Sequence, residues 1–172
     1  MAEAPIDHCP TITLPPPTPS FPIDNRLIME AEKGLAKHNT LFEFTGNVSV
    51  KHHNQLLTAD FVEYNKVLKQ LKAKNNLTFT QPGLIADGQT AQISLEREAG
   101  IIDHAEYLLP ELNARGHAEH FSFERGFAQL DNATYTTCPP EHVTWRLKAD
   151  SITLDKRNNS GSARNISIQI ND

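Results

Sequence analysis

Apolar and polar residues alternate along most of this chain with a period of two. Phe42 and Phe44 begin one such run, and Leu77 and Phe79 belong to another. Successive side chains of a β-strand point to opposite faces, so this alternation predicts strands with one buried face. The pattern therefore indicates an all-β protein.

An internal repeat favours strands even in two stretches, 27–38 and 95–112, that are rich in helix formers. Each copy carries an Ala-Asp pair between an apolar residue and an alternating run, at 56–64, 84–93 and 147–155. Shorter companions, in which an asparagine precedes an alternating strand, lie at 46–50, 75–79 and 164–170. The repeated unit is thus predicted to be a pair of antiparallel strands with a turn between them.

The apolar phase changes at the Ala-Asp step of the repeat. Leu57 is odd-numbered and Val62 even-numbered although both are expected to face inward, and the same change occurs at 147–155. A strict period of two forbids such a change, but one extra residue in one strand of a pair restores the inward direction. We expect a β-bulge or bend near Asp60 and Asp150, which would curve the sheet into a jellyroll, a sandwich or a solenoid.

Composition separates a leader from one domain and excludes several partners. Residues 1–26 contain seven of the 11 prolines and little to bury, so we expect a flexible leader followed by one domain at 27–172. The net charge of −5 disfavours nucleic-acid binding, which relies on a basic stripe. No apolar run approaches the roughly 18 residues of a membrane-spanning helix. The first residues lack a signal-peptide pattern, so either the protein is cytosolic or its export signal is absent from this sequence.

Candidate catalytic and metal-binding residues do not converge. Among the eight histidines, His117 and His120 are three apart, which places them on opposite faces of a strand. Asp60, Asp87 and Asp150 occupy equivalent positions of the repeat, which favours hydrogen bonding at turns or bulges over an acid–base pair. The chain contains no recognisable enzyme motif. We therefore predict no enzymatic activity, no metal and no cofactor.

The inward positions form a long apolar face. Small residues, among them Ala73, Ala86, Ala91 and Ala105, alternate with larger ones and would leave room between two layers. These positions can either fill a closed core or admit an apolar ligand such as an acyl chain. The candidate groove residues are Phe44, Val48, Val50, Leu57, Ala59, Val62, Tyr64, Leu71, Leu77, Phe79, Ile93, Leu95, Phe121 and Phe123. Ile101 is assigned to the same face.

The repeat resembles that of the OstA-like family, the periplasmic β-jellyroll domains of the lipopolysaccharide transport bridge. The resemblance covers about residues 27 to 170 and rests on F-T-G-N-V-S-V, L-L-T-A-D-F-V-E-Y and L-K-A-K-N-N-L-T-F. The segment 130–155, with its Y-T-T-C sequence and a tryptophan, is similar to the end of the periplasmic domain of the family's outer-membrane member. This resemblance implies a twisted, groove-forming β-jellyroll built from repeated antiparallel strand pairs.

The resemblance also implies a function, a place in the cell and a set of partners. It implies a relay module at the periplasmic face of the Gram-negative outer membrane, which receives lipopolysaccharide from a bridging jellyroll protein. The groove would hold the acyl chains of lipid A and pass the molecule to a C-terminal membrane barrel and its lipoprotein plug. The implied docking edge is Leu27, Ile28, Met29, Glu30 and Ala31, because edge strands join neighbouring jellyrolls in this family. The alternative is a structural or adhesin-like jellyroll interaction domain with a closed core.

The only two cysteines, Cys9 and Cys138, lie far apart in the sequence. Alternation that ends before Pro139 and Pro140 places Cys138 just after a strand, where its sulfur can point outward. The resemblance implies that both cysteines bridge to cysteines of a membrane barrel, which this sequence does not include. We therefore expect either free thiols or a Cys9–Cys138 bridge.

Overall fold

The computed structural model describes Cys9 and residues 26–171, so the predicted leader lies almost entirely outside the described residues. The strands are β1 (Ile28–Glu30), β2 (Lys33–Lys37), β3 (Leu41–His52), β4 (Gln55–Asn65), β5 (Gln70–Gln81), β6 (Leu84–Ser94), β7 (Ala99–Leu109), β8 (Ala114–Glu124), β9 (Phe127–Tyr135), β10 (Trp145–Asp155), β11 (Ser160–Arg164) and β12 (Ser167–Ile170). The one helical element among the described residues is a 3₁₀ turn, η1 (Pro110–Leu112). The predicted all-β architecture is confirmed, including the two stretches that are rich in helix formers.

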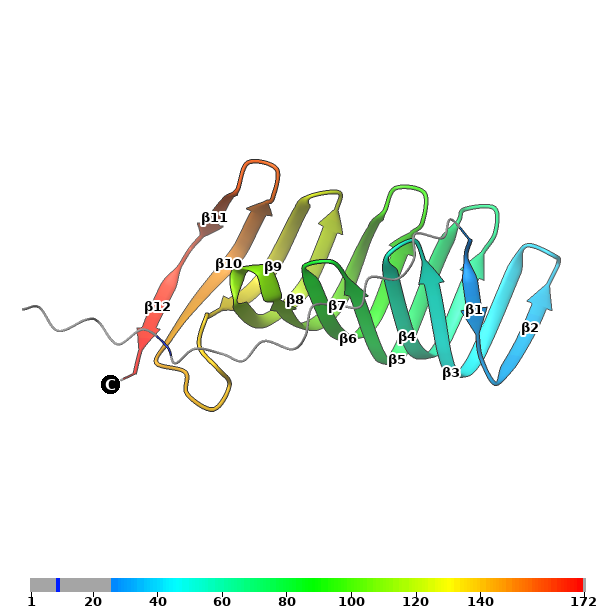
Figure 1. Cartoon of the computed structure of the whole chain (residues 1–172), viewed down its shortest axis with the longest axis horizontal. Helices are drawn as coiled ribbons and strands as arrows, with labels where there is room; N and C mark the ends of the chain where they lie inside the picture. Colours follow the sequence, from blue (N-terminus) through cyan, green and yellow to red (C-terminus); the bar gives the residue numbers. More distant parts are fainter. Residues whose placement is uncertain (1–8, 10–25, 172) are drawn as a thin grey trace, which may run out of the picture.

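The strands form one antiparallel sheet in which chain neighbours from β3 to β10 are also neighbours in space. Figure 1 shows these long strands side by side along the long axis of the molecule. At one end of the sheet, β1 and β2 pair with different halves of β3; at the other end, β12 and β11 pair with different halves of β10. The predicted groove-forming jellyroll is confirmed as an open sheet whose first and last strands do not pair with each other.

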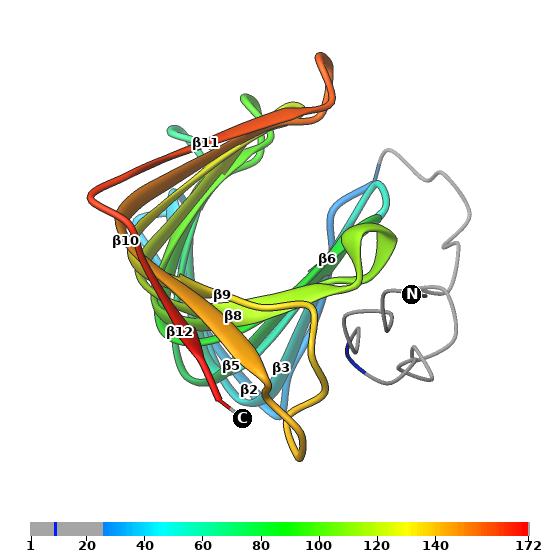
Figure 2. The same cartoon turned by 90° about the vertical axis from the view of Figure 1, so that its left-hand side faces the viewer.

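Each long strand bends near its middle, so the sheet folds over into a trough (Figure 2). One layer, here called the β11 wall, contains β2, β11 and the strand halves in register between them, such as 41–45 and 151–155. The other, the β12 wall, contains β1, β12 and the remaining halves of the long strands. Side chains from both walls meet in the trough and form the hydrophobic core.

Left-handed asparagines mark the line along which the sheet bends. Asn47, Asn76, Asn132 and Asn165 all have φ between 44° and 51°. Asparagine adopts this conformation more readily than most residues because its short amide can hydrogen-bond locally. Each of these four amides donates to a carboxylate: to Glu32 (2.5 Å), Asp60 (2.7 Å), Glu119 (2.6 Å) and Asp150 (2.7 Å), respectively.

The predicted irregularities at Asp60 and Asp150 are confirmed, although they differ in kind. The register shifts by one residue on both sides of β4, between Thr45 and Val48 of β3 and between Thr58 and Phe61 of β4. Around Asp150 the register with β9 is unchanged, so that site is a bend without an extra residue. The three repeated aspartates accept hydrogen bonds, as expected: Asp60 from Asn76 of β5, Asp87 from Thr78 of β5, and Asp150 from Asn165 in the link between β11 and β12.

The predicted turns of the repeat are confirmed: 46–50 and 75–79 lie in the second parts of β3 and β5, and a turn leads from each of these strands into β4 and β6. One sequence expectation was wrong in detail. Ile101 is only half-buried, whereas Ile102 is fully buried. The physical reason is His104, whose φ of 51° changes the pleat phase within β7 and brings Ile102 and Ala105 to the same face.

Candidate functional site

The structure places the predicted groove residues on the inner face of the trough. Phe44 and Tyr64 are half-buried near the β1 end and pack against the core. The other candidates are at most 8% exposed: Val48, Val50, Leu57, Ala59, Val62, Leu71, Leu77, Phe79, Ile93, Leu95, Phe121 and Phe123. Burial alone does not distinguish a lipid contact from a core contact.

Side chains from opposite walls touch over β3–β8 and close that part of the trough. Phe79 of the β12 wall stacks on Phe123 of the β11 wall, with ring centroids 4.9 Å apart. Tyr107 and Phe121 also meet across the trough, with tilted rings whose centroids are 5.6 Å apart. A void of only about 10 Å³ remains among the neighbouring side chains, too small to hold more than a water molecule. We call the inner faces of β3–β7 the closed half.

Toward β8–β11 the trough is open. A cavity of about 290 Å³ lies between the free edges of the two walls; it begins at the β3–β4 and β5–β6 turns and has Phe121, Phe123 and Leu154 among its lining residues. A second cavity of about 460 Å³ continues between Leu147, Ile152 and the strand β11. The two cavities share Glu111, Leu112, Leu154 and Lys156, so they adjoin, and we refer to them together as the cleft. We call this part of the trough the open half.

The edge of this cleft, here called the mouth, was not predicted from the sequence. It consists of Leu112 from the η1 turn, Phe127 from β9, and Leu154 and Lys156 from the β10–β11 hairpin. Leu112 is 44% exposed and Phe127 is 39% exposed, unlike the buried aromatic rings behind them. Alternation identified Leu154 as part of a repeat, but no local pattern indicates that these four residues meet.

Lys156 and His53 each contact a carboxylate of the opposite wall, and Arg125 pairs within the β11 wall. Lys156 of the β11 wall lies 3.2 Å from Glu111 of the η1 turn, a contact between residues 45 positions apart. His53 in the β3–β4 loop lies 3.7 Å from Glu98 in the β6–β7 loop, and Arg125 also binds Glu98 at 3.2 Å. These side chains are exposed or half-exposed, so each pair stabilises the fold only weakly.

The outer face carries polar pairs but no candidate metal centre among the described residues, where no three His, Cys, Asp or Glu side chains converge. His117 lies 3.2 Å from Glu106, and His120 lies 2.8 Å from Asp103. A hydrogen bond from Thr90, together with the bond to His120, lowers the pKa of Asp103. The same hydrogen bond, which Asp103 accepts, raises the pKa of His120. These pairs link neighbouring strands on the surface away from the trough.

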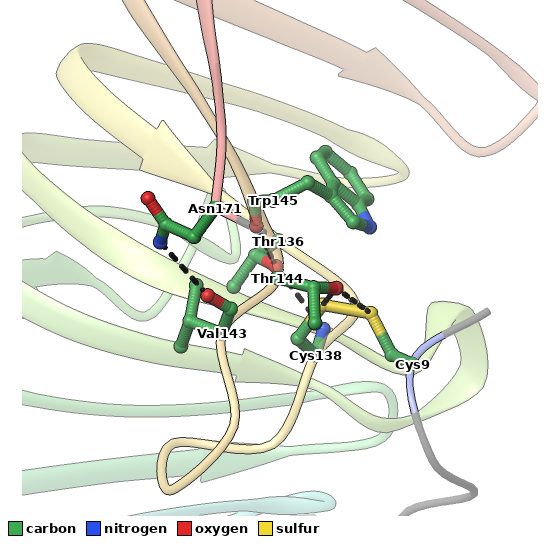
Figure 3. Close-up of a disulfide and its surroundings, with 7 residues drawn as sticks. All are labelled: Cys9, Thr136, Cys138, Val143, Thr144, Trp145 and Asn171. Carbon is green, nitrogen blue, oxygen red and sulfur yellow. Dashed lines mark hydrogen bonds between the residues drawn. A yellow bond between two sulfur atoms is a disulfide. The ribbon is translucent and has the colours of Figure 1, made fainter. Parts of the chain in front are cut away.

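A disulfide joins Cys9 to Cys138 across 129 positions of sequence (Figure 3). Cys138 follows the end of β9 as predicted, but the expected outward direction of its sulfur is wrong, because the side chain is fully buried. The Thr136 hydroxyl explains this: it accepts from the Cys138 amide at 3.1 Å and donates to the Trp145 carbonyl at 2.7 Å. This folds the loop back, with both sulfurs beside the Thr144 hydroxyl.

The two ends of the sheet present edge strands, which pair on one side only among the described residues. The predicted docking edge corresponds to β1, but Leu27 and Ala31 lie outside the strand, and β2 completes this end of the sheet. Leu35 of β2 is 56% exposed. At the opposite end, Ile168 and Ile170 of β12 are 58% and 76% exposed. Both ends therefore offer backbone and apolar side chains to a further strand.

No helix among the described residues is long and apolar enough to cross a membrane. No family model matches the chain. The chain is, however, 28% identical over 158 residues to the "LPS-assembly protein LptD" of Hahella chejuensis, which covers 91% of this chain and 20% of that protein. It is 29% identical over 160 residues to the protein of the same name from Acinetobacter baylyi, with coverages of 91% and 20%. The protein of that name from Methylococcus capsulatus is 30% identical over 122 residues, 70% of this chain and 12% of its own length.

Among solved structures, the chain is similar to LptH of Pseudomonas aeruginosa, described as the LptA-homologous periplasmic component of the lipopolysaccharide transport device. The sequence identity is 14% and the TM-score 0.48, with 88% of this chain and all of LptH covered. The chain spans a fifth or less of the length of the curated relatives named above. Over most of its own length, it is therefore homologous to a part of the LPS-assembly proteins LptD.

Proposed function

We propose that this chain is the periplasmic relay domain of a lipopolysaccharide assembly protein. It receives lipopolysaccharide from a bridging jellyroll protein, holds the acyl chains of lipid A in its trough, and passes the molecule to a membrane barrel closed by a lipoprotein plug. The domain works at the periplasmic face of the outer membrane. No chemical step is required, because the molecule is moved rather than converted.

The single observation that carries this proposal is the open half of the trough. Its cleft is walled by Phe121, Phe123, Ile152 and Leu154 and reaches the surface along one side. A ligand with long apolar chains can enter such a cleft sideways and gains about 0.8 kcal/mol for each CH₂ group that it buries. The names of the relatives supply the identity of the ligand.

Docking to the bridging protein is assigned to the end of the sheet formed by β1 and β2. Both strands lie at the end of the sheet order, and each pairs with β3 on one side only. Pairing with a foreign strand at this edge is β-augmentation, in which main-chain hydrogen bonds supply affinity. The opposite end, at β11 and β12, then faces the membrane barrel.

Photo-crosslinking tests the lipid relay. A benzophenone amino acid at Leu154 should form adducts with lipopolysaccharide, whereas the same group at Lys72 should form none, because Lys72 is exposed on the outer face of β5. Adducts at Lys72 but not at Leu154 would contradict the relay. They would favour the alternative, a structural or adhesin-like interaction domain whose closed core binds no lipid.

A further inference from the structure

Three basic side chains gather at the mouth from two neighbouring hairpins. Arg125 belongs to the β8–β9 hairpin, and Lys156 and Arg157 belong to the β10–β11 hairpin. The Lys156 amide donates a 2.8 Å hydrogen bond to the Gly126 carbonyl, which fixes the two hairpins side by side. A Cβ placed on Gly126 would lie 3.1 Å from Arg157 Cγ, so the Arg157 stem packs directly over this glycine.

Only one of the three basic groups pairs with the opposite wall. Arg125 binds Glu98 at 3.2 Å and Arg157 lies 3.5 Å from Asp155, both on the β11 wall. Lys156 instead reaches the η1 turn and binds Glu111 at 3.2 Å. The side chains of Lys156 and Glu111 are 48% and 63% exposed, so little free energy holds them together and another anion can replace Glu111.

The Lys156–Glu111 pair borders both cavities of the apolar cleft. Both cavities of the open half are lined by Leu112, Leu154 and Lys156. A tail that lies along Phe121 and Leu154 would therefore place its head beside the Lys156 ammonium. An apolar cleft bordered by Lys156 and Arg125, with Arg157 on the same hairpin as Lys156, matches an amphiphile with a phosphate head, because charge-assisted hydrogen bonds to phosphate are among the strongest in proteins.

We propose that Lys156 exchanges Glu111 for the phosphate head of a phosphorylated amphiphile, and that this exchange releases the bridge across the mouth. This inference rests on the proposed function, since it names the head-group chemistry and the opening step of the same groove. Lys156 is then the residue that determines the preference for anionic ligands. Glu111 is a competitor that occupies Lys156 when no ligand is bound.

The test compares two amphiphiles with the same acyl chain, lysophosphatidic acid and monoacylglycerol, by titration calorimetry below their micelle concentrations. The wild-type chain should bind the phosphorylated amphiphile about fivefold more tightly or better, as one exposed ion pair allows. Lys156→Gln should reduce this preference to near one, because the ammonium group that binds the phosphate head is gone. Glu111→Gln should tighten binding of the phosphorylated amphiphile about twofold to fivefold, because the competing carboxylate is gone.

Lys69→Gln is the matched control. Lys69 lies 3.6 Å from Glu96, has a similar exposure to Lys156, and stands on another hairpin of the β11 wall away from the mouth. This variant should retain the wild-type preference. Thermal unfolding should show that all three variants remain folded, since exposed ion pairs contribute little.

The outcomes separate this inference from the proposed function. If Lys156→Gln keeps the wild-type preference for lysophosphatidic acid over monoacylglycerol, the head-group site is wrong, but the proposed lipid groove is not affected. Failure of the wild-type chain to bind either amphiphile overturns both. Inorganic phosphate is the third probe: if it binds as tightly as lysophosphatidic acid, the basic cluster is an anion site independent of the groove, and the exchange is wrong.

Discussion

The closed and open halves of the trough are built from the same repeat but are packed differently. In the closed half, Leu71, Phe79 and Ile93 are at most 2% exposed and leave a void of about 10 Å³. In the open half, Leu147 and Leu154 are only half-buried and line a cavity of about 460 Å³. One half therefore holds the fold together, and the other keeps apolar surface available for a ligand.

The largest expected effect comes from truncating one leucine in each half. Leu71→Ala should lower the free energy of unfolding by about 3 kcal/mol, because it removes packed side-chain atoms and leaves a cavity. Leu154→Ala should lower it by about 1 kcal/mol or less, since its side chain is already half in solvent. Urea unfolding measures both, and equal losses would show that the open half is packed as tightly as the closed half.

Replacing an alanine by the larger leucine should also destabilise the closed half more than the open half. Ala73 is 4% exposed in the closed half, so Ala73→Leu should cost about 1–3 kcal/mol through overpacking. Ala163 is exposed and lines the open cavity, so Ala163→Leu should change stability by no more than about 0.5 kcal/mol while weakening amphiphile binding. Destabilisation by Ala163→Leu comparable to that of Ala73→Leu would remove the distinction.

Substitution of an asparagine at the bend should lower the free energy of unfolding by the same amount in both halves. Asn76→Ala in the closed half and Asn132→Ala in the open half each lose a hydrogen bond to a carboxylate and place alanine at positive φ. We expect about 1–2 kcal/mol for each in urea unfolding, with the glycine variants less destabilised because glycine adopts this φ freely. A much smaller cost at Asn132 would mean that the open half does not depend on the bend.

The smallest effect concerns the Asp103–His120 pair on the outer face. The folded pKa of His120 is raised, so its contribution is fully present below about pH 6.5 and is lost as the pH rises through the folded pKa. The folded pKa of Asp103 is lowered, so its contribution is present above about pH 4 and is lost as the pH falls through that value.

Wild-type and His120→Gln chains should therefore differ in thermal stability at pH 5.5 and converge near pH 8.5. Asp103→Asn should abolish that pH dependence, because it removes the hydrogen bond that raises the pKa of His120. A stability difference that grows with pH would have the wrong sign. The pair joins β7 to β8, where the closed and open halves meet, so this prediction does not distinguish the two halves.

The sequence predicted the strands, the bends and the inner face because these depend on local periodicity. Alternation identified Val50, Leu57 and Phe79 as inward, and the phase change located the bend at Asp60. It failed at Ile101, where a single left-handed histidine changes the phase without a recognisable signal. Histidine adopts positive φ more often than most non-glycine residues, but hydrophobic periodicity does not report the backbone conformation of a single residue.

The mouth was beyond sequence reasoning for a different reason. Lys156 and Glu111 meet only because the sheet folds over and brings the free edges of its walls together. Their separation of 45 residues matches no helix or strand periodicity that would indicate a contact. Each residue alone looks like an ordinary solvent-exposed charged side chain. The burial of Cys138 likewise depends on the Thr136 hydroxyl and the returning chain at Trp145.

The most direct test of the two-half account is a methyl NMR titration of the chain with lipopolysaccharide. Resonances from the open half, those of Leu112, Leu147, Ile152 and Leu154, should shift or broaden most. Resonances from the closed half, those of Leu71, Leu77 and Ile93, should change least. The largest changes at the closed-half methyl groups, with none at Leu154, would contradict the account.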